Sequence, residues 1–300
     1  MDSKKLSIND TSGDLFSKNV FSNKMYKDME ISFDRIQFDY KDNNWLFIEH
    51  ILIDKPVDSI EGLPIDIQSK IMRTVEFTEH FKDVSQKETK VIIDLFFDKN
   101  SSNKDTVMLM DENYKFHTMD IADYAAVFRE INFNGNENNK NKNYFPKKNN
   151  NYTREDNSGF ELSRVCLNGD VTYGFNLDKL FFNKNTKQIY LFELLLCDET
   201  QIVTPHTSHP NRYFQKNKSK FTSLFKLSKE MGTNLYLINY AKEGTKHEDK
   251  VKFMKVLDID EKNLKSPLLT EDKNLNLTQL KNGLEKRIIP MQTKKIKIGL

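Results

Sequence analysis

Residues 178–199, DKLFFNKNTKQIYLFELLLCDE, decide the fold class of the C-terminal half of this chain. Two apolar runs, at 175–182 and 188–197, flank a polar turn, and this pattern predicts a pair of antiparallel strands. Side chains on a strand alternate between its two faces, so Asp178 and Glu193 can point to the same side from neighbouring strands. The predicted hairpin therefore places two carboxylates on one face of a sheet.

The segment that follows this hairpin completes an α/β unit. A polar loop over 198–210 leads into a helical pattern over 211–231, and the glycine of Met231-Gly232-Thr233 is typical of a helix end. The apolar run 234–240, NLYLINY, predicts another strand. This order of hairpin, loop, helix and strand predicts a mixed sheet flanked by helices.

The same order of elements occurs in the N-terminal half. Strand patterns cover 31–38 and 45–53, a helical pattern covers 65–84, and a strongly apolar strand pattern covers 91–97. The run 119–131, MDIADYAAVFREI, predicts a further helix.

An ungapped alignment of the two hairpins suggests an internal repeat. Residues 34–55 placed over 178–199 share five identities in twenty-two positions. The aligned acids are Asp34 with Asp178 and Glu49 with Glu193, and the following helices carry Lys70 and Lys220 at similar places. A duplication and the chance similarity of two amphipathic hairpins both explain this number of identities. The fold prediction is therefore an α/β architecture that is either duplicated or one elaborated domain.

Composition suggests how the chain is divided. Nine of the eighteen positions in 134–151 are asparagine, and such a segment cannot bury enough apolar surface to offset the cost of ordering it. Six basic residues against one acid between 281 and 300 indicate a solvated tail. The expected organisation is an N-terminal α/β domain over 1–133, an Asn-rich linker over 134–157, a second α/β domain over 158–260 and a basic tail over 261–300.

Charge and cysteine usage indicate the cellular setting. The net charge of +2 neither demands nor excludes a nucleic-acid partner, because local patches matter more than the sum. Cys166 and Cys197 lie among apolar residues without metal-ligand spacing, so we expect buried free thiols and a reducing compartment. No secretory signal begins the sequence, and no apolar run approaches the ~20 residues that span a bilayer. We expect a soluble cytoplasmic protein without a membrane partner.

The paired acids suggest a metal site. Two carboxylates from adjacent strands provide the hard oxygen ligands that suit Mg²⁺ or Mn²⁺. An ion held by them would activate water and stabilise charge that develops on a phosphate. Asp178 and Glu193 are therefore candidate ligands and catalytic residues. Each acid has the alternative of a structural partner such as Arg164 or Lys220.

The region from Glu161 to Ala241 resembles the PD-(D/E)XK, or restriction-endonuclease-like, nucleases. The similarity consists of a strand with an acid (FNLDKL), a second strand with an acid (YLFELLLC), and a following helix and strand. It implies that Asp178 and Glu193 are metal ligands, joined by the backbone carbonyl of Leu194. Glu161 would correspond to the upstream acid that some members use.

One position departs from the pattern of this superfamily. The lysine expected two residues after the second acid is Leu195, and the aligned position in the first half is Ile51. The following helix offers a substitute, because Asn217 falls within its apolar stripe and Lys220 lies at the edge of that stripe. Lys220, with Asn217, is the candidate for a migrated lysine. The alternative is that Lys220 extends to solvent beside a core helix.

The loop before this helix is the candidate nucleic-acid contact. His209, Asn211 and Arg212, with Asn217 on the helix, are the candidates to contact phosphate or sugar, and Arg212 near a helix N-terminus favours an anion there. Formation of a turn and entry into the helix explain the same residues equally well.

These observations predict a metal-dependent nuclease that cleaves nucleic acid, with DNA favoured over RNA. The alternative is a pseudonuclease that binds nucleic acid or protein without cutting, which the leucine at 195 supports. A third hypothesis is a toxin or effector that binds a protein. Failure to bind nucleic acid at low salt would distinguish it from the other two. A homodimer is a further expectation from the resemblance, because restriction-like enzymes often act as dimers.

Overall fold

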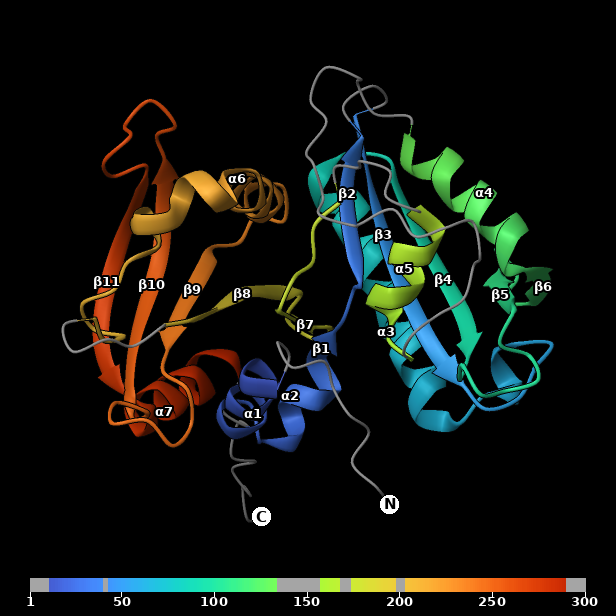
Figure 1. Cartoon of the computed structure of the whole chain (residues 1–300), viewed down its shortest axis with the longest axis horizontal. Helices are drawn as coiled ribbons and strands as arrows, with labels where there is room; N and C mark the ends of the chain where they lie inside the picture. Colours follow the sequence, from blue (N-terminus) through green and yellow to red (C-terminus); the bar gives the residue numbers. More distant parts are fainter. Residues whose placement is uncertain (1–10, 40–42, 134–156, 168–173, 198–202, 290–300) are drawn as a thin grey trace, which may run out of the picture.

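The computed structural model describes residues 11–39, 43–133, 157–167, 174–197 and 203–289. Over these residues the chain is a mixed α/β protein with two mixed sheets that lie side by side (Figure 1). The expected α/β class is confirmed. A restriction-endonuclease-like core remains a prediction.

The larger sheet contains the predicted C-terminal hairpin. Its strand order is β1 (Glu30–Ile31), β7 (Lys179–Asn183), β8 (Gln188–Leu196), β9 (Leu235–Tyr240), β10 (Lys250–Ile259) and β11 (Leu268–Asn276). Only β8 and β9 pair in parallel, and the crossover between them contains a 3₁₀ turn, η3 (Pro210–Tyr213), and the helix α6 (Phe214–Glu230). A parallel pair needs such a crossover, which explains the predicted helix between these two strands.

The smaller sheet contains the N-terminal hairpin. Its strand order is β2 (Arg35–Asp39), β3 (Asn44–Ile53), β4 (Thr89–Phe97), β5 (Thr106–Met110) and β6 (Phe116–Asp120). Here too only one pair, β3 with β4, is parallel, and α3 (Ile65–Ser85) connects the two strands. The expected helix over 65–84 is confirmed almost to the residue.

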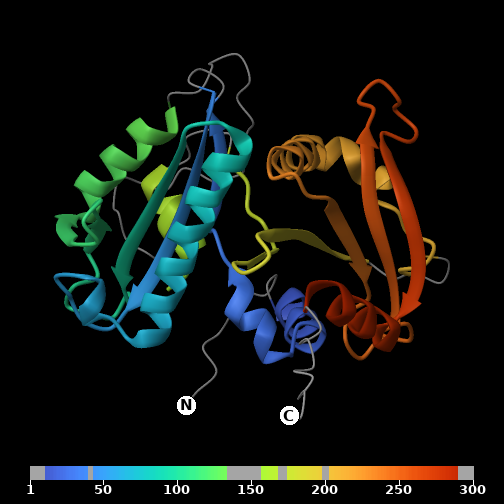
Figure 2. The ribbon, with the colours of Figure 1, turned by 180° about the vertical axis from the view of Figure 1, so that it is seen from behind.

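Helices cover both faces of each sheet (Figures 1 and 2). In the smaller sheet, α3 covers one face, while α4 (Ile121–Phe133) and α5 (Gly159–Leu167) cover the other. In the larger sheet, α6 covers one face, while α1 (Thr11–Val20), α2 (Lys24–Met29) and α7 (Leu277–Ile288) cover the other.

The two hairpins share their register, which supports an internal repeat. Arg35 pairs with Ile48 in the first hairpin, and Lys179 pairs with Phe192 in the second, so both partners shift by 144 positions. The parallel neighbours obey the same shift, since Ile93 pairs with Glu49 and Leu237 pairs with Glu193. Two unrelated hairpins can share a register, but a crossover strand at the same offset is a further, independent correspondence.

One apolar core joins the two units. Phe47 and Phe77 of the smaller unit lie in the same buried cluster as Phe182 and Leu227 of the larger unit. The rings of Phe77 and Phe182 are 5.8 Å apart, centroid to centroid, in an edge-to-face arrangement that favours aromatic pairs. The units therefore pack as one body rather than as two domains joined only by a linker.

The expected division of the chain is wrong at several boundaries. Phe16 and Tyr26, assigned to the first domain, are buried in the core of the larger sheet, and α5, assigned to the second domain, packs on the smaller sheet. The predicted tail over 261–300 contains β11 and α7 instead. A capping box at Asn276 begins α7. The expected linker lies outside the described residues except for Asn157, and 290–300 lie outside them altogether.

Two simpler expectations can be compared with the structure. Cys166 and Cys197 are both buried free thiols, as predicted. Nowhere in the described part of the chain does a helix have both the length and the apolar character needed to cross a membrane.

Candidate functional site

The predicted C-terminal residues come together at the junction of β7, β8 and α6. Lys220 of α6 forms an ion pair with Oε1 of Glu193 on β8. The Oδ2 atom of Asp178, just before β7, accepts a hydrogen bond of 2.7 Å from the backbone N–H of Leu194. Asp178, Glu193 and Lys220 are called the C-terminal cluster below.

The strand period places Lys220 on the face of the sheet where the resemblance predicts a lysine. Leu191, Glu193 and Leu195 occupy the face of β8 that α6 covers, and Leu191 and Leu195 belong to the core shared with α6. A lysine at position 195 would therefore point to the same side as Lys220. Phe221 and Leu224 anchor the helix on this face, both at 1% exposure or less, and hold Lys220 beside the acid.

Burial governs the electrostatics of the cluster. The pKa of Glu193 is raised from 4.5 to about 8: loss of solvent is the largest cause, the ammonium of Lys220 lowers the pKa, and the Asp178 carboxylate raises it. The pKa of Lys220 is itself raised: burial lowers it, but the two carboxylates outweigh burial.

An unsatisfied oxygen is compatible with a metal ion at these residues. Glu193 is 3% exposed, and among the described residues no donor reaches its Oε2 atom, while the Asp178 carboxylate lies within hydrogen-bonding reach of the Glu193 carboxyl group. Buried acceptors normally have a partner, so Oε2 is available to a cation or to a water held by one. Asn239 on β9, fully buried on the same face of the sheet, also has an unpartnered oxygen, Oδ1. Reasoning from sequence did not identify Asn239, although an amide in the apolar run NLYLINY was a visible signal.

The site is a two-carboxylate site. Among the residues that the structure describes, no group of three or more His, Cys, Asp and Glu side chains could hold a metal ion. Mg²⁺ usually takes one or two carboxylates and completes its shell with water and substrate phosphates. Asp178 and Glu193 would suffice for that type of binding, with the expected carbonyl of Leu194 as a further oxygen.

A second cluster occupies the equivalent place in the smaller unit. Asp34 Oδ2 accepts a hydrogen bond of 2.8 Å from the backbone N–H of His50, as Asp178 does from Leu194. Lys70 of α3 forms an ion pair of 2.5 Å with Oε1 of Glu49. Asp34, Glu49 and Lys70 are called the N-terminal cluster below. It reproduces both acids and the helix lysine of the C-terminal cluster.

The upstream acid does not join either pair. Glu161 lies on α5, whose neighbours Leu162 and Val165 pack into the core of the smaller sheet. Its carboxylate accepts a hydrogen bond of 2.6 Å from Nε of Arg164. The expectation that Glu161 completes a three-acid site with Asp178 is wrong, because its helix packs on the other sheet.

In the predicted phosphate-binding loop, His209 and Asn211 make hydrogen bonds within the protein, whereas Arg212 is exposed. His209 caps η3 by accepting a hydrogen bond of 3.1 Å from the backbone N–H of Asn211, and burial lowers its pKa. Asn211 holds the backbone of Leu268 on β11 through two hydrogen bonds. These contacts favour the structural interpretation of both residues. Arg212 is exposed beside the start of α6, and its role as a phosphate contact stays a prediction.

Asn217 does not face inward. It is exposed on α6, so its predicted partnership with Lys220 inside the apolar stripe is wrong. The buried face of α6 contains Phe214, Phe221 and Leu224, as the sequence indicates, and Asn217 lies outside it.

A Ser–His–Asp arrangement lies inside the smaller unit. His50 Nδ1 is 2.8 Å from Asp94 Oδ2, and its Nε2 is 2.7 Å from Ser163 Oγ. All three side chains are buried, and Tyr124 donates a hydrogen bond of 2.5 Å to the same Asp94 oxygen. Burial lowers the pKa of His50, but Asp94 outweighs burial and the net shift is upward. Because the Ser163 hydroxyl and the Asp94 carboxylate are enclosed in the core with the ring, the network fastens α5 and α4 to the sheet.

We expect Ser163→Ala to destabilise the fold by about 2 kcal/mol, because it leaves the buried Nε2 atom of His50 without its hydrogen-bond partner. Urea unfolding at neutral pH measures this loss. Ser69→Ala is the matched control, since the Ser69 hydroxyl lies on an exposed helix surface, and it should change stability by less than about 0.5 kcal/mol. Equal effects of the two variants would contradict a structural role for the network.

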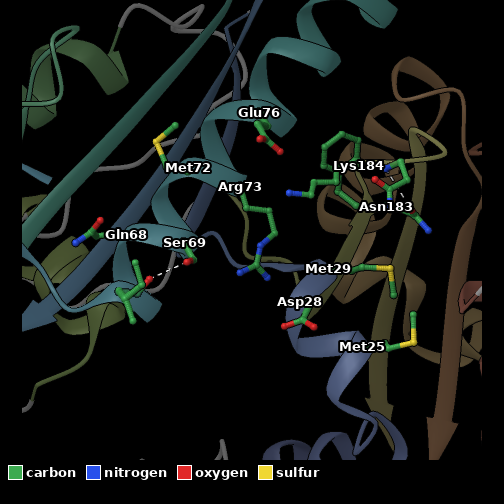
Figure 3. A pocket seen from close by; sticks show the side chains of 13 residues that line it. Met25, Asp28, Met29, Gln68, Ser69, Met72, Arg73, Glu76, Asn183 and Lys184 are labelled. Atoms are coloured by element: carbon green, nitrogen blue, oxygen red, sulfur yellow. Dashed lines mark hydrogen bonds between the residues drawn. The ribbon is translucent and has the colours of Figure 1, made fainter. Parts of the chain in front are cut away.

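A pocket of about 600 Å³ lies between α2, α3 and the turn that joins β7 to β8 (Figure 3). Arg73 reaches across it from α3 and donates a hydrogen bond of 2.9 Å to the backbone carbonyl of Glu30 on β1. No residue of the C-terminal cluster lines this pocket. It lies at the junction of the two units, and the candidate chemistry lies elsewhere.

Comparisons of the chain with protein-family profiles, with curated protein sequences and with solved structures find no match. The candidate function therefore depends on the residues of the two clusters and on the order of elements around them.

Proposed function

We propose that this protein is a metal-dependent nuclease that hydrolyses phosphodiester bonds of nucleic acid, with DNA as the favoured substrate class. The observation that carries the proposal is the helix-borne Lys220 paired with Glu193, beside Asp178 and an unpartnered Glu193 oxygen. The cluster supplies two acids and a lysine, which is the set of residues that the resemblance to PD-(D/E)XK nucleases requires.

Each residue of the cluster has a separate role in this proposal. Asp178 and Glu193 would hold Mg²⁺ or Mn²⁺, which would activate water and stabilise negative charge on the phosphate. The hydrogen bond from Leu194 N–H fixes the orientation of Asp178 before any ligand binds. Lys220, positioned by the buried face of α6, places a positive charge next to the acids and would stabilise charge on the phosphate oxygens.

The surface of α6 supports a polyanionic substrate. Lys216 is exposed one helical turn before Lys220, and Arg212 is exposed at the start of the helix. Both would contact phosphates on either side of the bond to be cleaved, and such contacts position a nucleic acid without reading its sequence.

Cleavage of single- and double-stranded DNA and RNA with Mg²⁺ or Mn²⁺ tests this function. We expect metal-dependent cleavage of at least one substrate by the wild type. Asp178→Ala should lower it by at least about a hundredfold, because the variant loses a ligand. Asp34→Ala, the same change in the N-terminal cluster, is the matched control and should keep cleavage if it folds. Unchanged cleavage by purified Asp178→Ala would contradict the proposal.

The pseudonuclease remains the second candidate, and Leu195 is the observation that favours it. Binding of nucleic acid at low salt without cleavage under any metal condition would support that function instead.

A further inference from the structure

The two clusters differ in how their glutamates are satisfied. In the N-terminal cluster, Glu49 Oε1 accepts a hydrogen bond of 3.0 Å from Ser32 Oγ in addition to the ion pair with Lys70. Its Oε2 accepts a hydrogen bond of 2.9 Å from Thr74 Oγ1. Both oxygens of Glu49 are therefore occupied by donors of the protein itself.

The C-terminal cluster lacks the second set of donors. Thr74 lies four residues after Lys70 on α3, whereas the residue four after Lys220 on α6 is Leu224. Leu224 is fully buried and cannot donate, and no donor in the described part of the chain reaches Glu193 Oε2. The hydroxyl of Thr74 thus occupies Glu49 Oε2, whereas the alkyl side chain of Leu224 leaves Glu193 Oε2 without a donor.

Two further features also distinguish the C-terminal cluster from the N-terminal cluster. The strand residue beside Leu195 is Asn239, with an unpartnered oxygen, whereas the residue beside Ile51 is the apolar Leu95. In the smaller unit, Gly159 at the start of α5 lies so close to Asp34 that a Cβ atom there would overlap the carboxylate. The N-terminal cluster is thus covered by the start of α5, and both oxygens of Glu49 have partners within the protein.

We propose that only the C-terminal cluster takes a divalent metal ion, and that the N-terminal cluster is a closed structural copy of it. The second part of the proposal rests on the proposed nuclease function and on the protein acting as a monomer: with one competent site per chain, a monomer cuts one strand of a duplex per binding event, whereas a homodimer would carry two sites. The product from a double-stranded substrate is then a nick.

Counting bound Mn²⁺ by electron paramagnetic resonance tests the metal assignment without any measurement of cleavage. The wild type should bind one Mn²⁺ per chain. Glu193→Gln should weaken that binding by at least about tenfold, and Glu49→Gln, its matched control, should leave it within about twofold. Circular dichroism should show that both variants are folded. Two Mn²⁺ ions per chain, no bound Mn²⁺, or loss of the ion in Glu49→Gln alone would overturn the proposal.

Cleavage of supercoiled plasmid tests the consequence. The nicked circle should accumulate before the linear form, and linear product formed directly from supercoiled DNA would overturn the one-strand inference. One bound Mn²⁺ without cleavage of any nucleic acid would contradict the nuclease function and leave the metal assignment supported. The two proposals can therefore fail separately.

Discussion

Replacing Lys220 by methionine is expected to lower the cleavage rate by about a hundred- to a thousandfold, the usual cost of removing one donor that stabilises transition-state charge. Methionine preserves the length and most of the apolar contacts of the lysine side chain, so α6 should still pack on β8. What is lost is the positive charge beside Glu193 and Asp178. Single-turnover cleavage at saturating metal and substrate measures this loss directly.

The matched control is Lys70→Met in the N-terminal cluster. Lys70 holds Glu49 as Lys220 holds Glu193, so both changes leave a buried glutamate without its ammonium partner. Glu49 keeps the hydroxyl groups of Ser32 and Thr74, so we expect a stability loss of about 1–3 kcal/mol and little change in the cleavage rate. Equal loss of cleavage in the two variants would mean that Lys220 supports the fold rather than the chemistry.

A second readout separates charge stabilisation from simple packing. Lys220 opposes the upward shift in the pKa of Glu193, so its removal should raise that pKa further and move the pH dependence of Mn²⁺ binding to higher pH. Lys220→Arg should restore part of the metal binding because it restores the charge. A variant that merely loosened the helix would not respond to the conservative replacement.

Local patterns predicted the elements that carry the site. The helix over 65–84 and the two hairpins have strong periodicity, and α3 (Ile65–Ser85), β3 (Asn44–Ile53) and β8 (Gln188–Leu196) follow it closely. Pairing of Lys220 with Glu193 was also accessible, because a polar residue at the edge of an apolar helical stripe needs a partner.

Non-local packing was not predictable in the same way. Glu161 lies away from Asp178 because α5 packs on the smaller sheet. No short-range sequence pattern indicates on which sheet a helix packs. Similarly, β1 pairs with β7 across about 150 residues of chain, which places the first two helices on the larger sheet.

The C-terminal region shows a different reason for failure. Most side chains of β11 (Leu268–Asn276) are exposed, so the strand has too few apolar residues to suggest a sheet. Its pairing with β10 and the burial of Leu280, Leu284 and Ile288 of α7 stabilise the region instead. The many lysines lie on the surface of these elements, so composition alone indicated a tail, although the helix has an apolar stripe.

The stability of the metal-free protein is expected to fall as pH rises from about 4.5 to about 8, and Glu193 is the residue responsible. Its pKa is about 8 in the folded protein and near the ordinary 4.5 when exposed, so within this window the folded state retains a proton that the unfolded state has lost. Such a difference lowers the free energy of unfolding with rising pH, by at most about 1.4 kcal/mol per pH unit for one group.

Urea unfolding in the presence of a chelator at pH 5, 7 and 9 measures this effect by comparing the wild type with Glu193→Gln. Glutamine does not ionise, so the variant should gain stability relative to the wild type as pH rises, and the difference should level off above about pH 8. Glu49→Gln should instead be less stable than the wild type at neutral pH, because it exchanges a carboxylate held by Ser32, Thr74 and Lys70 for a neutral amide. A constant difference between the wild type and Glu193→Gln across this range would show that Glu193 is not held protonated by burial. Opposite effects of the same change at two equivalent positions would mean that one carboxylate stabilises the fold, while the other is kept at a cost to stability and is available to a ligand.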